Sequence, residues 1–106
     1  MKNSINILGT EYSIETDESL IDKGADGMCK EYDKQIAIRP LGNMLSDDDL
    51  TVTKSKRYNE VLRHEIIHAF FSESGLDDYS GNEQLVNWLA IQFPKMQKAF
   101  EEVGCL

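Results

Sequence analysis

The chain contains two histidines, His64 and His68, which stand four residues apart with Glu65 directly after the first. On a helix both imidazoles project from one face, because a turn takes 3.6 residues, so they can share one ion. Glu65 lies about 100° further round, where it cannot readily join them as a ligand but can take a proton from a metal-bound water. The HExxH pattern therefore predicts a Zn²⁺ site with His64 and His68 as ligands and Glu65 as catalytic base.

A simpler interpretation is that these polar side chains lie on one helix without binding a common ion. The neighbouring residues argue against it, because they are large and apolar. They are Leu62, Ile66, Ile67, Phe70 and Phe71. Three ionisable groups in such a segment are costly to bury without a partner, and a metal ion would provide one. We therefore expect metal binding, on a helix that is buried almost all round in its second half.

A catalytic zinc needs three protein ligands and one open position. Because the chain has no third histidine, an extended HExxHxxGxxH site is excluded and a carboxylate is the favoured third ligand. The candidates are Glu73, Asp77, Asp78 and Glu83, with Cys29 and Cys105 as weaker alternatives. Glu73 lies on the same helix and points elsewhere. Glu83 is favoured because it opens the next helix, which must pack back against the first to bury its own apolar surface.

Several residues near the motif have two interpretations each. Ser80-Gly81-Asn82-Glu83 also fits a capping box, in which Glu83 would only bond the first turn of its helix. Asn87, one turn after Glu83, either orients a ligating histidine or is an ordinary exposed helix residue. Tyr79 is a candidate donor to a developing oxyanion, although a packing role is favoured for it. For Arg63, a surface position is favoured over one behind the ligands.

Three segments resemble the ImmA/IrrE-type metallopeptidases, especially the short versions common in phages and mobile elements. They are Arg63-His64-Glu65-Ile66-Ile67-His68-Ala69-Phe70, Ser74-Gly75-Leu76 and Asn82-Glu83-Gln84-Leu85-Val86-Asn87-Trp88-Leu89-Ala90. The pairing of HExxH with a later Asn-Glu is also similar to the gluzincin pattern. The resemblance implies a zinc peptidase with His64, His68 and Glu83 as ligands and Glu65 as base. It further implies a regulatory protein substrate, such as a transcriptional repressor.

Two other functions stay open beside peptide-bond hydrolysis. In one, the metal holds two helices together and the domain binds a protein partner without cutting it. In the other, the chain is an accessory protein that has lost activity, against which the intact Glu65 argues, because a purely structural site needs no base. Loss of the fold on chelation would favour a structural ion.

The N-terminal half has the alternation of strands. Apolar residues at every second position predict a hairpin over 4–16, and a second hairpin is expected over 27–39, ended by Pro40. A loop or short helical turn is expected over 17–25. Because peptidases of this kind bind substrate as a strand added to a sheet edge, we take the strand over 35–39 as the candidate edge.

The C-terminal half has helical spacing. A helix is predicted from about 54 to Gly75, a loop over 76–81, and a second buried helix over 85–93 with Trp88 in the core. Pro94 should break or kink that helix, and a short terminal helix is expected around 94–103. The fold expected is α+β, a small zincin-like domain in which N-terminal antiparallel hairpins pack on the HExxH helix and a C-terminal helix.

Length and charge limit the remaining possibilities. The 106 residues are enough for a single minimal domain over 1–106. The net charge of −8 disfavours a nucleic-acid partner, and no apolar run approaches the roughly 18 residues that a membrane span needs. The start of the chain has no signal-peptide core, and the two cysteines are far apart, so a cytoplasmic protein with reduced thiols is expected.

Overall fold

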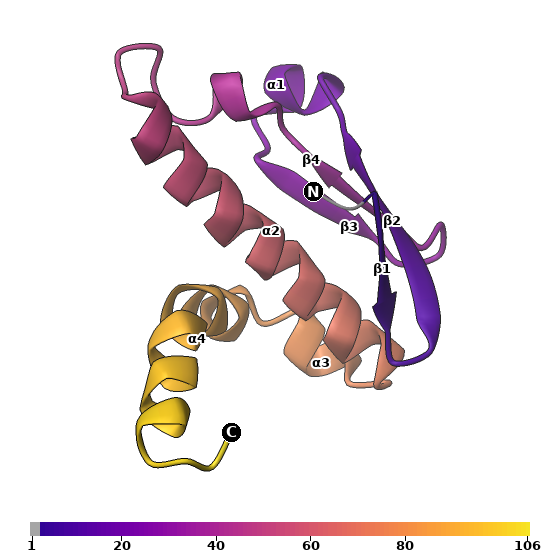
Figure 1. Cartoon of the computed structure of the whole chain (residues 1–106). Coiled ribbons are helices and arrows are strands. Elements are labelled where there is room, and N and C mark those ends of the chain that lie inside the picture. Colours follow the sequence, from indigo (N-terminus) through magenta and orange to yellow (C-terminus); the bar gives the residue numbers. More distant parts are fainter. Residues whose placement is uncertain (1–2) are drawn as a thin grey trace.

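The computed structural model describes residues 3–106 and shows a small sheet covered by one long helix, with further helices beyond it (Figure 1). The strands are β1 (Ser4–Ile7), β2 (Thr10–Thr16), β3 (Gly27–Lys30) and β4 (Gln35–Ile38). The helices are α1 (Ser19–Lys23), the 3₁₀ turn η1 (Leu41–Asn43), α2 (Thr51–Glu73), α3 (Asp77–Ser80) and α4 (Glu83–Glu102). The predicted α+β class is confirmed.

The sheet has the strand order β1-β2-β4-β3. The two predicted antiparallel hairpins are present, and they are joined by parallel pairing of β2 with β4, which puts Ile14 opposite Ile36. β4 is therefore an interior strand and β3 an edge strand, so the expectation that 35–39 forms the edge is wrong. Ile36, Ala37 and Ile38 are all buried, as is typical of a strand covered on both faces.

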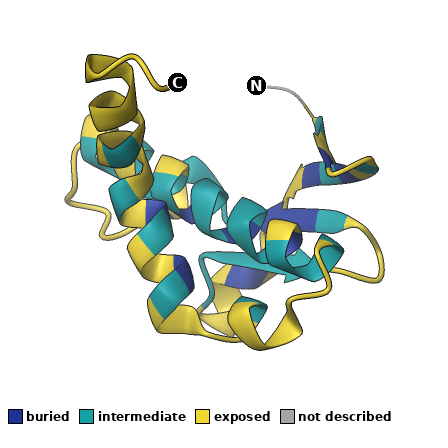
Figure 2. Ribbon diagram, turned by 90° about the horizontal axis from the view of Figure 1, so that it is seen from below, coloured by how far each residue is buried: buried dark blue, intermediate teal, exposed yellow. Residues whose placement is uncertain are grey.

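The apolar core lies between the sheet and α2 (Figure 2). One cluster of buried residues joins the strands to the C-terminal half of α2, and it contains Ile7, Tyr12, Ile14, Ile36 and Ala69. A second cluster joins β4 and the segment after η1 to the middle of α2, and it contains Ile38, Met44 and Val61. The same helix thus anchors both hairpins, which fixes its rotation relative to the sheet.

The helices differ from expectation in extent and burial. α2 begins at Thr51, and the expected loop over 76–81 contains α3. α4 continues through Pro94 to Glu102, so the separate terminal helix is wrong, although Figure 1 shows a change of direction along α4. Trp88 is 52% exposed and is not a core residue. None of the helices within residues 3–106 is long and apolar enough to cross a membrane.

The prediction that the second half of α2 is buried all round is also wrong. Phe70 is 41% exposed, while Val61, Glu65 and Ala69 form its buried stripe at intervals of four residues. The reason is that the sheet covers only one side of α2, and α4 covers only part of the other. Gly75, with a φ of 73°, follows the end of α2 and lets the chain turn into α3.

Candidate metal centre

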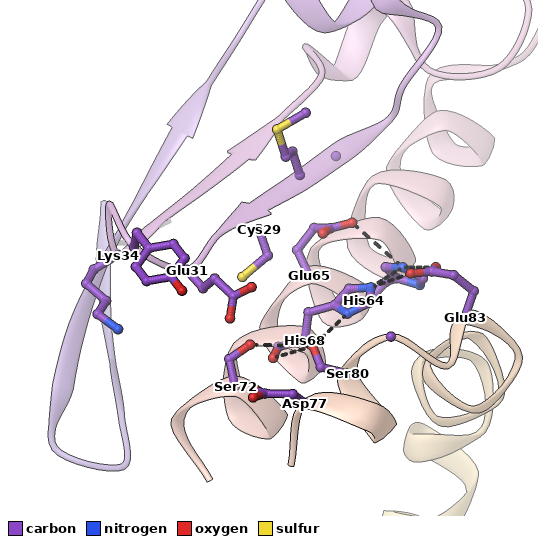
Figure 3. Close-up of a pocket in the computed structure, with 14 residues that line it drawn as sticks. Cys29, Glu31, Lys34, His64, Glu65, His68, Ser72, Asp77, Ser80 and Glu83 are labelled. Atoms are coloured by element: carbon purple, nitrogen blue, oxygen red, sulfur yellow. Dashed lines mark hydrogen bonds and ion pairs between the residues drawn. The ribbon is translucent and has the colours of Figure 1, made fainter. Parts of the chain in front are cut away.

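α2 presents the motif residues on two different faces. Glu65 lies in the buried stripe that faces the sheet and is 7% exposed. His64 and His68 lie on the adjacent face, toward α4, with their side chains 15% and 14% exposed. Their Nε2 atoms are 3.0 Å apart, so both imidazoles aim at one point (Figure 3). This is the relative placement that the spacing predicts for two ligands and a neighbouring base.

Glu83 reaches the same point from the first turn of α4. Asn82 caps that helix, because its side-chain oxygen accepts the Leu85 N–H at 3.1 Å. The cap is therefore Asn82 and not Ser80, so the capping-box interpretation of Ser80 does not apply. The two carboxylate oxygens of Glu83 lie 3.1 Å from His64 Nε2 and 3.0 Å from His68 Nε2. Glu83 is left free to contribute a ligand atom.

The three side chains fit a divalent metal by geometry and chemistry. Their ligand atoms all lie within 4.8 Å of one another, and the closest approaches are 3.0, 3.1 and 3.0 Å. Ligands of a tetrahedral zinc at about 2.0–2.1 Å are about 3.3–3.4 Å apart, so a small adjustment would suffice. Two imidazoles and one carboxylate are a donor set that zinc accepts. His64, His68 and Glu83 can thus hold a metal ion.

Glu65 is held beside this group by the edge strand β3. Its carboxylate lies 3.8 Å from His64 Nε2 and accepts a hydrogen bond from the Cys29 backbone N–H. Burial and the negative charge of Glu83 raise the pKa of Glu65 to about 7, against the smaller opposing effect of that hydrogen bond. A carboxyl group with such a pKa can gain and lose a proton near neutrality.

The close approach of β3 to α2 depends on Gly27. A β-carbon at this position would lie 2.8 Å from Val61 Cγ1 and 3.0 Å from Glu65 Cγ. The first distance is shorter than real β-carbon contacts and the second is tighter than most of them, so glycine lets β3 approach Glu65 this closely without a shift of these side chains. β3 is one of the two edge strands of the sheet, the other being β1, and no strand within residues 3–106 pairs with its outer side.

Each histidine has a polar neighbour that can orient its ring. Asn87 hydrogen-bonds His64, which opposes the lowering of the His64 pKa by burial and by His68. Ser80 Oγ lies 3.3 Å from both His68 Nδ1 and the His68 carbonyl oxygen. It can accept from Nδ1–H and donate to the carbonyl, which leaves Nε2 available for a metal. The sequence suggests Ser80 only as a helix cap, because its distance from His68 along the chain does not indicate that the two side chains meet.

The group opens into a cavity of about 700 Å³ between β3 and the end of α2. Its walls include Cys29, Glu31, Ser72 and Asp77 (Figure 3). Asp77 therefore borders the cavity but does not belong to the group that converges with the two histidines. Asp78 neither lines the cavity nor belongs to that group. Tyr79 packs against Phe71 and does not line the cavity, so the structure offers no support for it as an oxyanion donor.

The remaining candidates lie elsewhere. Cys29 and Cys105 are free thiols, and neither belongs to the converging group. Glu73, at the far end of α2, bonds Tyr12 and Lys34. Arg63 is half-buried and donates to the Ala90 carbonyl of α4, so the expectation of a surface role is wrong. Arg63 contacts a residue of another helix, and the spacing of residues in the sequence does not predict such a contact.

Comparison of the chain with protein-family models, with curated proteins and with solved structures gave no match.

Proposed function

We propose that this protein is a zinc-dependent peptidase in which His64, His68 and Glu83 hold the metal and Glu65 is the base. The observation that carries the proposal is the convergence of the three ligand side chains next to a buried carboxyl group with a raised pKa. A purely structural metal site has no use for a fourth, non-ligating acid at this place. The resemblance to ImmA/IrrE-type metallopeptidases supports the same reaction and suggests a regulatory protein as substrate.

Each side chain would have its own role in the reaction. A zinc ion would act as a Lewis acid toward the scissile carbonyl and make water more acidic. Glu65 would accept the proton of the attacking water and later deliver it to the leaving amine. Ser80 and Asn87 would hold the two imidazoles in their ligating orientation. The half-enclosed cavity would limit access of bulk water to the reacting bond.

The substrate would bind along β3. Gly27, Met28 and Cys29 of this strand line the cavity, and an extended peptide can add to an edge strand by main-chain hydrogen bonds. A peptide placed there would cross directly in front of His64 and Glu65, because β3 contacts Glu65 through Gly27 and Cys29. This replaces the placement along 35–39, whose strand is paired on both sides.

The test is hydrolysis of fluorescein-labelled casein and of a quenched-fluorescent peptide library by the zinc-loaded protein. Glu65→Gln should bind zinc normally and lose activity by about 10²–10⁴-fold, the usual contribution of a general base. Glu11→Gln, at an exposed position on β2, is the matched control and should cleave at the wild-type rate. Wild-type activity in Glu65→Gln, or no cleavage of either substrate by zinc-loaded wild type, would refute the proposal.

A second candidate is a metal-stabilised protein-binding module. The observation in its favour is the apolar surface of α4, where Trp88, Ile91 and Phe93 are 52%, 45% and 48% exposed. In this case the metal would join α2 to α4, and Glu65→Gln would leave the binding of the protein partner unchanged. Unfolding of the whole domain on chelation, together with absence of cleavage, would favour the module over the peptidase.

A further inference from the structure

α4 contains a proline in its interior, at a position that costs the helix a hydrogen bond. Pro94 has no N–H to offer the carbonyl four residues earlier, and its ring pushes that carbonyl away from the helix axis. The carbonyl concerned belongs to Ala90, a residue that is 1% exposed. A buried carbonyl without a donor is unfavourable by about as much as a lost hydrogen bond. The structure must therefore supply another donor.

Arg63 of α2 supplies it. Its Nε lies 2.7 Å from the Ala90 carbonyl oxygen. A guanidinium donor is charged, so this bond is stronger than the neutral backbone bond that Pro94 removes. Arg63 directly precedes His64, and the bond therefore connects α4 to α2 at the turn that carries the first proposed ligand.

This bond is the last of three contacts along one face of α4. Glu83, Asn87 and Ala90 follow one another at intervals of four and three residues, so they share the face turned toward α2. Glu83 contacts both histidines, Asn87 bonds His64, and the Ala90 carbonyl bonds Arg63. Because the Glu83 side chain is 63% exposed, little packing holds it in place. Its position depends on where α4 lies against α2.

We propose that Arg63 is a positioning residue for the metal site. By bonding the carbonyl that Pro94 leaves without its helical donor, Arg63 fixes α4 in the position that presents Glu83 to His64 and His68. The inference rests on the proposed metal ligands and not on peptidase activity. Pro94 and Arg63 act together, because the proline leaves the Ala90 carbonyl without its helical donor and Arg63 donates to that carbonyl.

The test is a zinc titration of four variants of the full chain, read out as the dissociation constant with circular dichroism as a check of folding. Arg63→Met should weaken zinc binding about tenfold or more, the usual effect of losing a residue that supports a ligand. Pro94→Ala should change it less than about twofold, because the Ala90 carbonyl has a second lone pair that Arg63 can still use, while Arg63→Met/Pro94→Ala should bind zinc as weakly as Arg63→Met. In the double variant, the substitution of Pro94 restores a backbone N–H that can bond the Ala90 carbonyl within α4, which should recover the melting temperature but not the bond between α4 and α2. Lys98→Met, at an exposed position on α4, is the control.

Several outcomes would overturn the assignment. One is wild-type zinc affinity in Arg63→Met, and another is a double variant with wild-type affinity, because the bond within α4 would then suffice without a bond to α2. A lower melting temperature with unchanged zinc affinity would mean that Arg63 is merely structural. If Arg63→Met does not fold, the double variant decides, because it should bind zinc about tenfold or more weakly than Pro94→Ala, which keeps Arg63. Failure of folded wild type to bind zinc would refute the metal site itself, whereas loss of peptidase activity alone would not bear on Arg63.

Discussion

Glu65 and the two histidines occupy different faces of α2, and this separates the proposed base from the proposed metal ligands. The histidines face α4, which brings Glu83, whereas Glu65 faces the sheet, where burial and the Glu83 charge raise its pKa to about 7. Its carboxylate keeps one backbone donor, Cys29 N–H, on the edge strand. β3 therefore positions the proposed base, whereas α4 positions Glu83 against the two histidines of α2.

At the residue scale, Gly27→Ala tests how closely β3 must approach Glu65. The added β-carbon would lie 2.8 Å from Val61 Cγ1 and 3.0 Å from Glu65 Cγ, so β3 or these side chains of α2 must shift. We expect a loss of about 1–3 kcal/mol in the free energy of unfolding, as is usual for overpacking, and a displaced Glu65. Urea denaturation measures the first effect and casein hydrolysis the second. Gly42→Ala is the matched control, because its β-carbon would meet nothing within 4 Å.

At the scale of elements, the end of α2 is tied to both hairpins through Glu73. Its Oε1 accepts hydrogen bonds from Tyr12 OH on β2 at 2.9 Å and from Lys34 Nζ, just before β4, at 2.8 Å. Lys34 first, and Tyr12 next, lower the Glu73 pKa below its ordinary value. The charged form is thus the one that joins helix and sheet, and protonation weakens the junction.

The pH dependence of stability follows from the direction of that shift. A carboxyl group with a lowered pKa in the folded state contributes stability that is complete above its ordinary pKa and is lost as pH falls through the folded value. We expect the melting temperature to fall below about pH 5, and to fall less steeply in Glu73→Gln. Thermal melts between pH 3 and 7, with Glu11→Gln as control, measure the difference; equal slopes in Glu73→Gln and wild type would contradict it.

At the scale of the whole molecule, the proposed metal site lies between two parts that are packed to different degrees. The two apolar clusters hold α2 on the sheet and contain no proposed ligand. α4, in contrast, buries Val86 and Ala90 but leaves much of its apolar surface exposed. A metal bound by α2 and α4 would therefore stabilise the placement of α4 more than the core.

Removal of the metal by a chelator should affect the placement of α4 more than the core between α2 and the sheet. Zinc at a hundred times its dissociation constant stabilises the folded state by about 2.7 kcal/mol, which corresponds to a melting shift of roughly 10–20 °C for a domain of this size. We expect chelator to lower the melting temperature by that amount while helical circular dichroism at 25 °C is largely kept. His64→Ala/His68→Ala should show no zinc-dependent shift. Complete unfolding on chelation would instead support the metal-stabilised module.

Features that depend on neighbouring residues could be predicted from the sequence. The four-residue interval places His64 and His68 on one face of α2, and period-two alternation predicted the hairpin over 4–16, because side-chain direction follows from backbone geometry alone. Glu83 was also within reach of sequence reasoning, since a following apolar helix must fold back. The boundary errors at Thr51 and Pro94 arose where packing overrides local preference, as when Arg63 provides the donor that Pro94 lacks.

Which strands lie at the edges of the sheet, and which residues support the proposed ligands, depend on contacts between distant segments of the chain. The parallel pairing of β2 with β4 encloses β4 and leaves β3 beside Glu65, and no local pattern specifies that pairing. Ser80 reaches His68, and Arg63 reaches Ala90, across gaps of 12 and 27 residues. Such contacts depend on how whole elements pack, because burying their apolar faces selects one arrangement from many that the local sequence allows.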